Sequence, residues 1–152
     1  MCAFQKKSEA LGDYKVELFI MASQQGEGIM INPKDDSVFN SAYEAQESGY
    51  EQQYYSVTDR TPSKILQKIE LSKEEYLTFR SRIVRDDEGK IISSHYGKII
   101  IDGTIDYGID FDNPERTRVG FIYYFNPNEN DRNLEYDGKN NLLNPRDPHY
   151  AP

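Results

Sequence analysis

Four closely spaced aspartates are the residues best placed for chemistry in this sequence: Asp102, Asp106, Asp110 and Asp112. Asp106 and Asp110 are four positions apart, so both carboxylates lie on one face if this segment is a β-strand. Such a pair can act as general acid and base, or bind calcium together with Asn113. Aspartates alternating with apolar residues are also typical of any strand with one solvated face, which is the simpler interpretation.

A second group of oxygen-bearing side chains loosely follows the ligand spacing of an EF-hand calcium loop: Asn126, Asn128, Asn130 and Asp137. The pattern fails where that loop needs a glycine, because Asp131 occupies the sixth position. The first position lacks the usual aspartate, and the preceding segment has the pattern of a strand rather than a helix. We therefore expect no calcium site here.

The remaining reactive side chains form no known catalytic motif. The sequence lacks a phosphate-binding glycine loop, a dinucleotide fingerprint, a nucleophile elbow, a zinc-protease motif and a Cys-x-x-Cys pair. His95 and His149 are the two histidines, too few for a histidine-rich zinc site. Cys2 stands next to Met1, away from any residue that would activate it. The sequence predicts neither an enzyme nor a cofactor or metal.

Tyrosines and glutamates are concentrated in one short region, and its members are Tyr43, Glu44, Glu47, Tyr50, Glu51, Tyr54 and Tyr55. Tyrosine provides rigid amphipathic area, which protein interfaces use as anchors. We predict a partner-binding surface made of these residues, with Asp106 and Asp110 adding negative charge. The alternative, that the tyrosines only cover the sheet, stays open.

The charge balance restricts the class of partner. The chain has 26 acidic and 18 basic side chains and a formal net charge of −8, with a sequence pI of about 4.8. Nucleic acids and anionic membranes need a basic surface, so this composition argues against both. We expect a basic or mixed-charge protein partner, although an acidic surface also serves solubility alone.

Compartment depends on how Cys2 is interpreted. A single cysteine forms no internal disulfide, no run reaches the ~18 apolar residues of a membrane helix, and residues 1–14 lack the apolar core of a signal peptide. As written, the sequence indicates a cytoplasmic protein. Alternatively, Cys2 is the lipid anchor of a bacterial lipoprotein in the periplasm or at a membrane, if Met1 replaces a removed signal sequence.

The elements that would position these residues begin with the segment from Tyr96 to Phe125. Apolar residues recur at every second position through most of this segment, which is the period of a strand with one buried face. Asp102-Gly103 lies between the first two alternating runs, and this dipeptide favours a tight hairpin. We predict a three-stranded antiparallel meander.

Earlier segments predict two hairpins and two helices. Residues 14–22 and 28–31 indicate the first hairpin, and residues 50–57 with 64–71 favour a second, although 50–57 could also extend a helix. Helices are expected over 37–48, ended by Gly49, and over 72–84. The second begins with Ser72-Lys73-Glu74-Glu75, a capping box, followed by apolar residues at helical spacing.

Together these elements predict an α+β fold with one mostly antiparallel sheet, a C-terminal meander, two helices on one face and an irregular C-terminal tail. We expect residues 1–13 to be a flexible segment, 14–125 a single domain, and 126–152 a polar extended tail packed on the domain or a partner. Five apolar side chains are expected to fix that tail: Leu134, Tyr136, Leu142, Leu143 and Tyr150.

These observations favour a non-enzymatic acidic binding protein, bacterial or from a phage, of the inhibitor or immunity type that neutralises a toxin or an enzyme. A lipid-anchored envelope lipoprotein is the first alternative. A small carboxylate-dependent hydrolase using Asp106 and Asp110 is the second.

Overall fold

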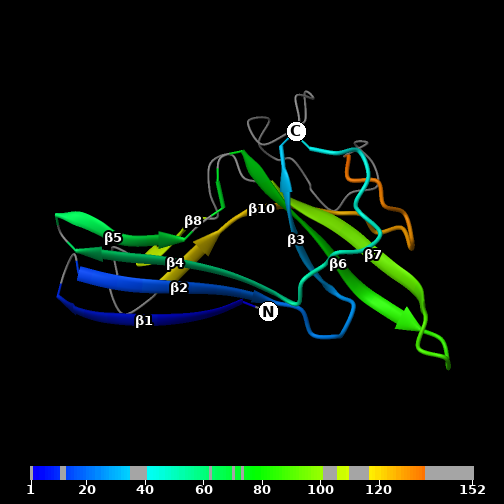
Figure 1. The fold of residues 1–152 in the computed structure, drawn as a ribbon, viewed down its shortest axis with the longest axis horizontal. Helices are drawn as coiled ribbons and strands as arrows, with labels where there is room; N and C mark the ends of the chain where they lie inside the picture. Colours follow the sequence, from blue (N-terminus) through cyan, green and yellow to red (C-terminus); the bar gives the residue numbers. More distant parts are fainter. Residues whose placement is uncertain are drawn as a thin grey trace.

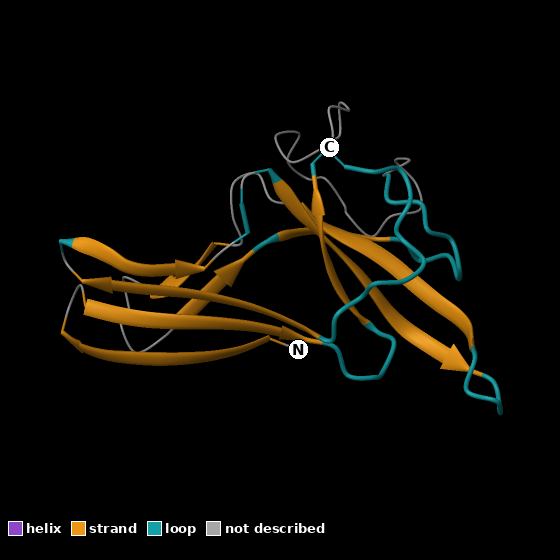
Figure 2. Ribbon diagram, in the orientation of Figure 1, coloured by secondary structure: helices purple, strands orange, loops and turns teal. Residues whose placement is uncertain are grey.

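The computed structural model describes residues 2–10, 13–34, 41–61, 63–69, 71–72, 74–100, 106–109 and 117–135. These residues form strands and loops, without a helix (Figure 2). The strands are β1 Cys2–Ala10, β2 Asp13–Met21, β3 Gly28–Pro33, β4 Gln53–Thr61, β5 Lys64–Ile69, β6 Glu75–Arg85, β7 Ile91–Ile100, β8 Asp106–Ile109, β9 Thr117–Gly120 and β10 Ile122–Phe125.

Two antiparallel four-stranded sheets make up the fold (Figure 1). Sheet I has the strand order β1-β2-β4-β5, and sheet II has the order β10-β7-β6-β3. Strands β8 and β9 form a separate two-stranded ribbon. The chain crosses between the sheets after β2, after β3 and after β5, so neighbours in sequence are often not neighbours in a sheet.

The expected α+β fold with two helices is wrong, most clearly at residues 72–84. This segment leads into β6, which lies between β3 and β7 in sheet II. Half of the expected capping box does form, because the Glu75 carboxylate accepts a hydrogen bond of 2.9 Å from the Ser72 amide. That contact closes a turn before the strand. Burial between two neighbouring strands outweighs the local helical pattern.

The other expected helix, over 37–48, is also absent where the structure can be compared with it. Residues 35–40 lie outside the described part, and residues 41–48 form a loop. Its Ala45 is buried, as a helix face would require, but it packs in a cluster with Leu134 from a distant loop. The apolar spacing there reflects packing of a loop.

Strand pairing differs from the predicted hairpins at two places. Strand β2 pairs with β1 and β4 in sheet I, whereas β3 pairs with β6 in sheet II, so the first hairpin is wrong. The three-stranded meander is wrong as a whole, because within the described residues β7 pairs with β6 and β10 and not with β8. Its last two strands do pair in part, since β8 and β9 are antiparallel neighbours. Asp102-Gly103 lies outside the described residues. The second hairpin is confirmed, since β4 and β5 pair antiparallel.

The ends of the chain bear on the expected division into segments. Part of the stretch 1–13 forms β1, which pairs along β2 with Cys2 opposite Ile20. Of the apolar residues expected to fix the tail, Leu134 is buried, and the other four lie outside the described residues. The division at 13 and 125 stays a prediction.

The main core lies between the sheets and joins them. Its buried members are Leu18, Ile29, Tyr54, Leu71, Leu77 and Ile99. In sheet II, Leu77 and Ile99 lie opposite each other in neighbouring strands, so both belong to the face that meets sheet I. Full burial of a leucine side chain contributes roughly 1.5–3 kcal/mol, which makes this face the main source of cohesion between the sheets.

Replacing Leu77 by alanine tests this core. Leu77 is 0% exposed, and its truncation should lower the free energy of unfolding by about 2–5 kcal/mol, because a cavity remains between the sheets. Urea unfolding followed by circular dichroism measures the loss. Ile65→Ala, at a half-exposed position of β5, is the control and should cost under about 1 kcal/mol. Equal losses in the two variants would contradict this description of the core.

Candidate functional site

Two loops lie side by side over the face of sheet II that points away from sheet I. We call them the paired loops, residues 41–51 and 126–135. The Ala45 amide donates to the Arg132 carbonyl at 2.8 Å, and the Leu134 amide donates to the Tyr43 carbonyl at 2.9 Å. These bonds flank an antiparallel bridge between Glu44 and Asn133. The two loops therefore form a short ladder although they are far apart in sequence.

The paired loops are fixed to sheet II by apolar packing. Ala45 and Leu134 are buried with Tyr96 of β7, and Tyr50 packs against this group. Tyr96 lies opposite Arg80 of β6, so both belong to the outer face of the sheet. The loop backbone thus has an apolar anchor of its own.

Polar contacts add to this attachment. The Ala42 amide donates to the Tyr76 hydroxyl at 3.0 Å. The ammonium of Lys98, a buried residue of β7, donates to the Ser41 hydroxyl at 2.7 Å. A buried ammonium needs such partners, because loss of hydration without compensation is costly. The start of the 41–51 loop is therefore tied to β6 and β7.

The asparagines of the second loop shape its backbone. The Asn126 side chain accepts from the Asn128 amide at 3.0 Å. Asn130, whose φ is 58°, accepts from the Ser94 amide and donates to the Ile92 carbonyl, each at 3.0 Å. The spacing that resembled a calcium loop thus corresponds to a side chain that closes a turn, Asn126, and one that ties the loop to β7, Asn130. Asp137 lies outside the described residues.

Asp131 takes part in the same turn network. Its carboxylate accepts from the Asn133 amide at 3.0 Å. Burial by itself raises the pKa of Asp131, but hydrogen bonds from the Asn133 amide and from the Asn126 and Asn128 side chains outweigh it and hold the pKa below its ordinary value. Asp131 is therefore ionised at neutral pH.

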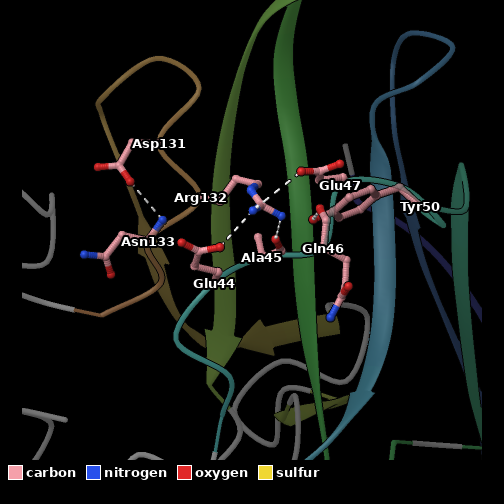
Figure 3. Close-up of polar contacts among 8 residues, drawn as sticks. All are labelled: Glu44, Ala45, Gln46, Glu47, Tyr50, Asp131, Arg132 and Asn133. Carbon is pink, nitrogen blue, oxygen red and sulfur yellow. Dashed lines mark hydrogen bonds and ion pairs between the residues drawn. The ribbon is translucent and has the colours of Figure 1, made fainter.

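Arg132 lies at the centre of the paired loops (Figure 3). Its guanidinium donates to the Ala45 carbonyl at 3.0 Å and to the Glu44 carboxylate at 2.8 Å. A Glu47 carboxylate oxygen lies 3.6 Å from it. The Arg132 side chain is 29% exposed, against 55% for Glu44 and 80% for Glu47. One cation thus stands between two carboxylates that present most of their surface to solvent.

Tyr50 supports the 41–51 loop from the side of sheet II. Its hydroxyl donates to the Gln46 carbonyl at 2.9 Å, and the Arg80 guanidinium lies 4.8 Å from the centre of its ring. Burial raises the pKa of Tyr50 to about 12, and the Thr78 hydroxyl and the nearby Arg80 charge oppose this only in part. Tyr50 therefore stays protonated and acts as a hydrogen-bond donor.

The structure divides the tyrosines and glutamates proposed as a binding surface. Tyr43, Glu44, Glu47 and Glu51 are exposed on the 41–51 loop, and we call these four residues the acidic loop surface. Tyr50 is half-buried beneath it. Tyr54 lies in the core between the sheets, and Tyr55 donates to Glu17 of β2 at 2.9 Å. The last two therefore belong to sheet I, apart from the loop.

Two other predicted residues, Asp106 and Cys2, lie elsewhere in the described part of the chain. Asp106 is the first residue of β8, opposite Gly120, and Asp110 lies outside the described residues, so their use as a carboxylate pair stays a prediction. Cys2 is the first residue of β1, and the lipid-anchor hypothesis likewise stays a prediction. The backbone positions alone favour neither.

Sequence reasoning missed Arg132 and its loop. Arg132 and Glu44 are 88 positions apart, and no local pattern connects them. The polar composition of the 126–135 segment predicted an irregular tail, and only the expectation that Leu134 fixes it pointed to packing. Polar residues that close turns look the same in a sequence as residues of a loose tail.

No family model matches the chain, and neither the curated proteins nor the solved structures contain a match. Within the described ranges, no group of three or more His, Cys, Asp or Glu side chains is placed to hold a metal ion. The same ranges contain no helix of the length and apolar character that a membrane crossing requires. The acidic loop surface is therefore described from the contacts and exposure of its own residues.

Arg132→Ala tests whether this side chain fixes the paired loops. The substitution removes the donor to the Ala45 carbonyl and leaves Glu44 and Glu47 without their cation, which should cost roughly 1–2 kcal/mol of unfolding free energy. Hydrogen exchange of the Ala45 and Leu134 amides should accelerate. Arg60→Ala, at an exposed position of β4, is the control and should change neither quantity. Unchanged exchange at Ala45 and Leu134 would show that packing alone holds the loops.

Proposed function

We propose that this protein is a non-enzymatic binding protein that docks a basic or mixed-charge protein through the acidic loop surface. The observation that supports this most is the exposure of Tyr43, Glu44 and Glu47 on a loop whose backbone is fixed by the second loop. A surface of this kind suits recognition of another protein. In cellular terms the proposal is an inhibitor or immunity-type protein that occupies a toxin or an enzyme.

Rigidity of the loop is the first argument for docking. Ordering a flexible loop on binding costs conformational entropy, which lowers affinity. Here Ala45 and Leu134 already pair the two loops, and the Glu51 amide and the Ile29 carbonyl are joined at 2.8 Å. A partner would therefore meet carboxylates whose backbone positions are set in advance.

Charge is the second argument. Glu44 and Glu47 share the single guanidinium of Arg132, and Glu51 adds a further exposed carboxylate on the same loop. The loop carries more negative than positive charge, in agreement with the net charge of −8 for the chain. Complementary charge mainly accelerates association and excludes acidic partners.

Tyr43 supplies the third argument. The residue is 56% exposed, and its hydroxyl accepts from the Asn133 side chain at 3.2 Å. A tyrosine held by one hydrogen bond offers a ring of fixed position, which is the type of side chain that often dominates interface energy. We expect Tyr43 to be the apolar anchor among the carboxylates.

Charge reversal on the loop tests the proposal. Glu47→Lys combined with Glu51→Lys should weaken binding of a basic partner by about 10- to 100-fold and slow its association, because steering and complementarity are lost. Candidate partners are the basic products of genes that flank its own, and isothermal titration calorimetry and stopped-flow kinetics measure the complex at low and moderate salt.

A matched control carries the same change of charge elsewhere. Asp87→Lys combined with Glu88→Lys places two lysines at exposed positions of the turn between β6 and β7, and it should alter the affinity by less than about threefold. Equal weakening by both pairs would mean that only overall charge matters. Absence of a complex with any basic candidate at low salt would contradict the proposed function itself.

A further inference from the structure

Strand β6 contains a bulge with unusual backbone geometry. Its register with β7 shifts between Ser81 and Val84, and Arg82 has a φ of 52°. A non-glycine residue rarely adopts a positive φ, and such geometry persists only where the surroundings favour it. The Arg82 guanidinium lies 4.6 Å from the centre of the Phe125 ring.

The amides of this bulge are directed at the carboxylate of Glu27. This side chain is buried, with 7% of the residue exposed, and it accepts a hydrogen bond of 2.8 Å from the Ser23 hydroxyl. Backbone amides of Arg82, Ile83 and Ser23 also donate to it. Two successive amides of a bulge that point at one anion form a nest, a known mode of anion binding. We call this arrangement the Glu27 nest.

Glu27 belongs to the segment that carries the chain from β2 of sheet I to β3 of sheet II, residues 22–27. Three contacts attach this crossover segment to β6. Besides the nest, the Arg80 side chain donates to the Gly26 carbonyl at 2.7 Å and the Arg85 side chain donates to the Gln25 carbonyl at 2.6 Å. Both arginines stay charged at all ordinary pH values, so the carboxylate is the one of these three anchors that responds to acid.

Strands β6 and β7 supply the charged and titratable groups that lie nearest to the nest in the strand register. Arg80, Arg82 and Arg85 all belong to β6, and His95 of β7 lies opposite Ser81 in the register, one strand beyond the bulge. The carboxylate of Asp86 is engaged elsewhere, because it accepts from the Glu88 and Lys90 amides of its own turn. On the side of the paired loops, the exposed Glu51 is attached through its backbone to Ile29.

We propose that the Glu27 nest is an acid-sensitive latch, which ties the bulge of β6 to the crossover segment while the carboxylate is ionised and frees the bulge amides on protonation, with both sheets still folded and the Arg80 and Arg85 contacts still in place. Protonation removes the charge and turns one acceptor oxygen into a donor, which the bulge amides cannot bind. The core between the sheets contains no Glu27 contact, so it does not depend on the latch.

The direction of the pH dependence follows from the contacts. Burial by itself raises the pKa of Glu27, and hydrogen bonds from Ser23 and from the Arg82 and Ile83 amides outweigh it, so that the pKa lies below its ordinary value. A carboxyl group whose pKa is lowered in the folded state stabilises the protein at pH values above the pKa of the unfolded chain. This stabilisation is lost as the pH falls through the lowered pKa. The latch is therefore closed at neutral pH and opens only in acid.

Residue-resolved NMR of the intact chain tests the proposal. Between pH 7 and pH 2.5, the amide signals of Arg82 and Ile83 should follow one titration with the midpoint of the Glu27 side-chain carboxyl. Their hydrogen exchange, after correction for intrinsic rates, should accelerate at least tenfold below that midpoint, while Leu18 and Leu77 stay protected. Simultaneous loss of protection at all four amides would overturn the proposal, because it would show global unfolding.

Two variants separate the latch from general acid effects. Glu27→Gln should abolish the titration of the Arg82 and Ile83 amides and accelerate their exchange at neutral pH. Glu17→Gln is the matched control, since Glu17 also has a lowered pKa, held by Lys15 and Tyr55 in sheet I; it should leave both amides unchanged. Arg82 and Ile83 amides that still titrate in Glu27→Gln would overturn the proposal. If that variant fails to fold, the wild-type titration alone decides.

Discussion

Burial of the central part of sheet II on both of its faces is the constraint on which the rest of the structure depends. One face, with Leu77 and Ile99, meets sheet I across the main core. The other face, with Lys98 and Tyr96, lies beneath the paired loops.

A strand buried on both faces has no clear alternation of polar and apolar residues, and β6 follows this rule, because Tyr76, Leu77 and Thr78 are buried in succession. Polar groups on such a strand need internal partners, and Thr78 accepts from the Asn32 side chain at 2.9 Å for this reason.

The same constraint explains why the sequence predicts strands better than their pairing. Alternation at residues 14–22 and 64–71 locates β2 and β5, because a strand imposes a two-residue period on its own segment of sequence. The turn near Pro62 predicts the β4–β5 hairpin. Partner choice is a non-local property: β2 and β3 follow each other in the chain and still belong to different sheets. Residues 72–84 were misassigned because apolar residues on two buried faces of a bulged strand have the spacing of one helical face.

The candidate site was only half visible in the sequence, for a related physical reason. The exposed glutamates and Tyr43 are adjacent along the chain, so their clustering could be found directly. Tyr54 and Tyr55 belong to the same stretch of sequence, but β4 begins before them and directs them to opposite faces of sheet I. Arg132 could not be found, because its role arises when two distant loops pair over sheet II. The composition of residues 126–135 shows that the segment is polar, but its position on sheet II is set by packing, which composition does not reveal.

Fold and recognition are therefore carried by different atoms of the same loops. Backbone pairing, the apolar group around Leu134 and the bond from Arg132 to the Ala45 carbonyl hold the loops in place. The exposed ion pairs with Glu44 and Glu47 contribute little to stability, as is usual for solvated pairs. Arg80 joins this region to the crossover segment, because one guanidinium donates to the Gly26 carbonyl and to the Glu47 carbonyl, at 2.7 and 2.8 Å. Carboxylates on such a support can change to suit another partner without loss of the fold, whereas a change in Arg80 or Arg132 moves the support itself.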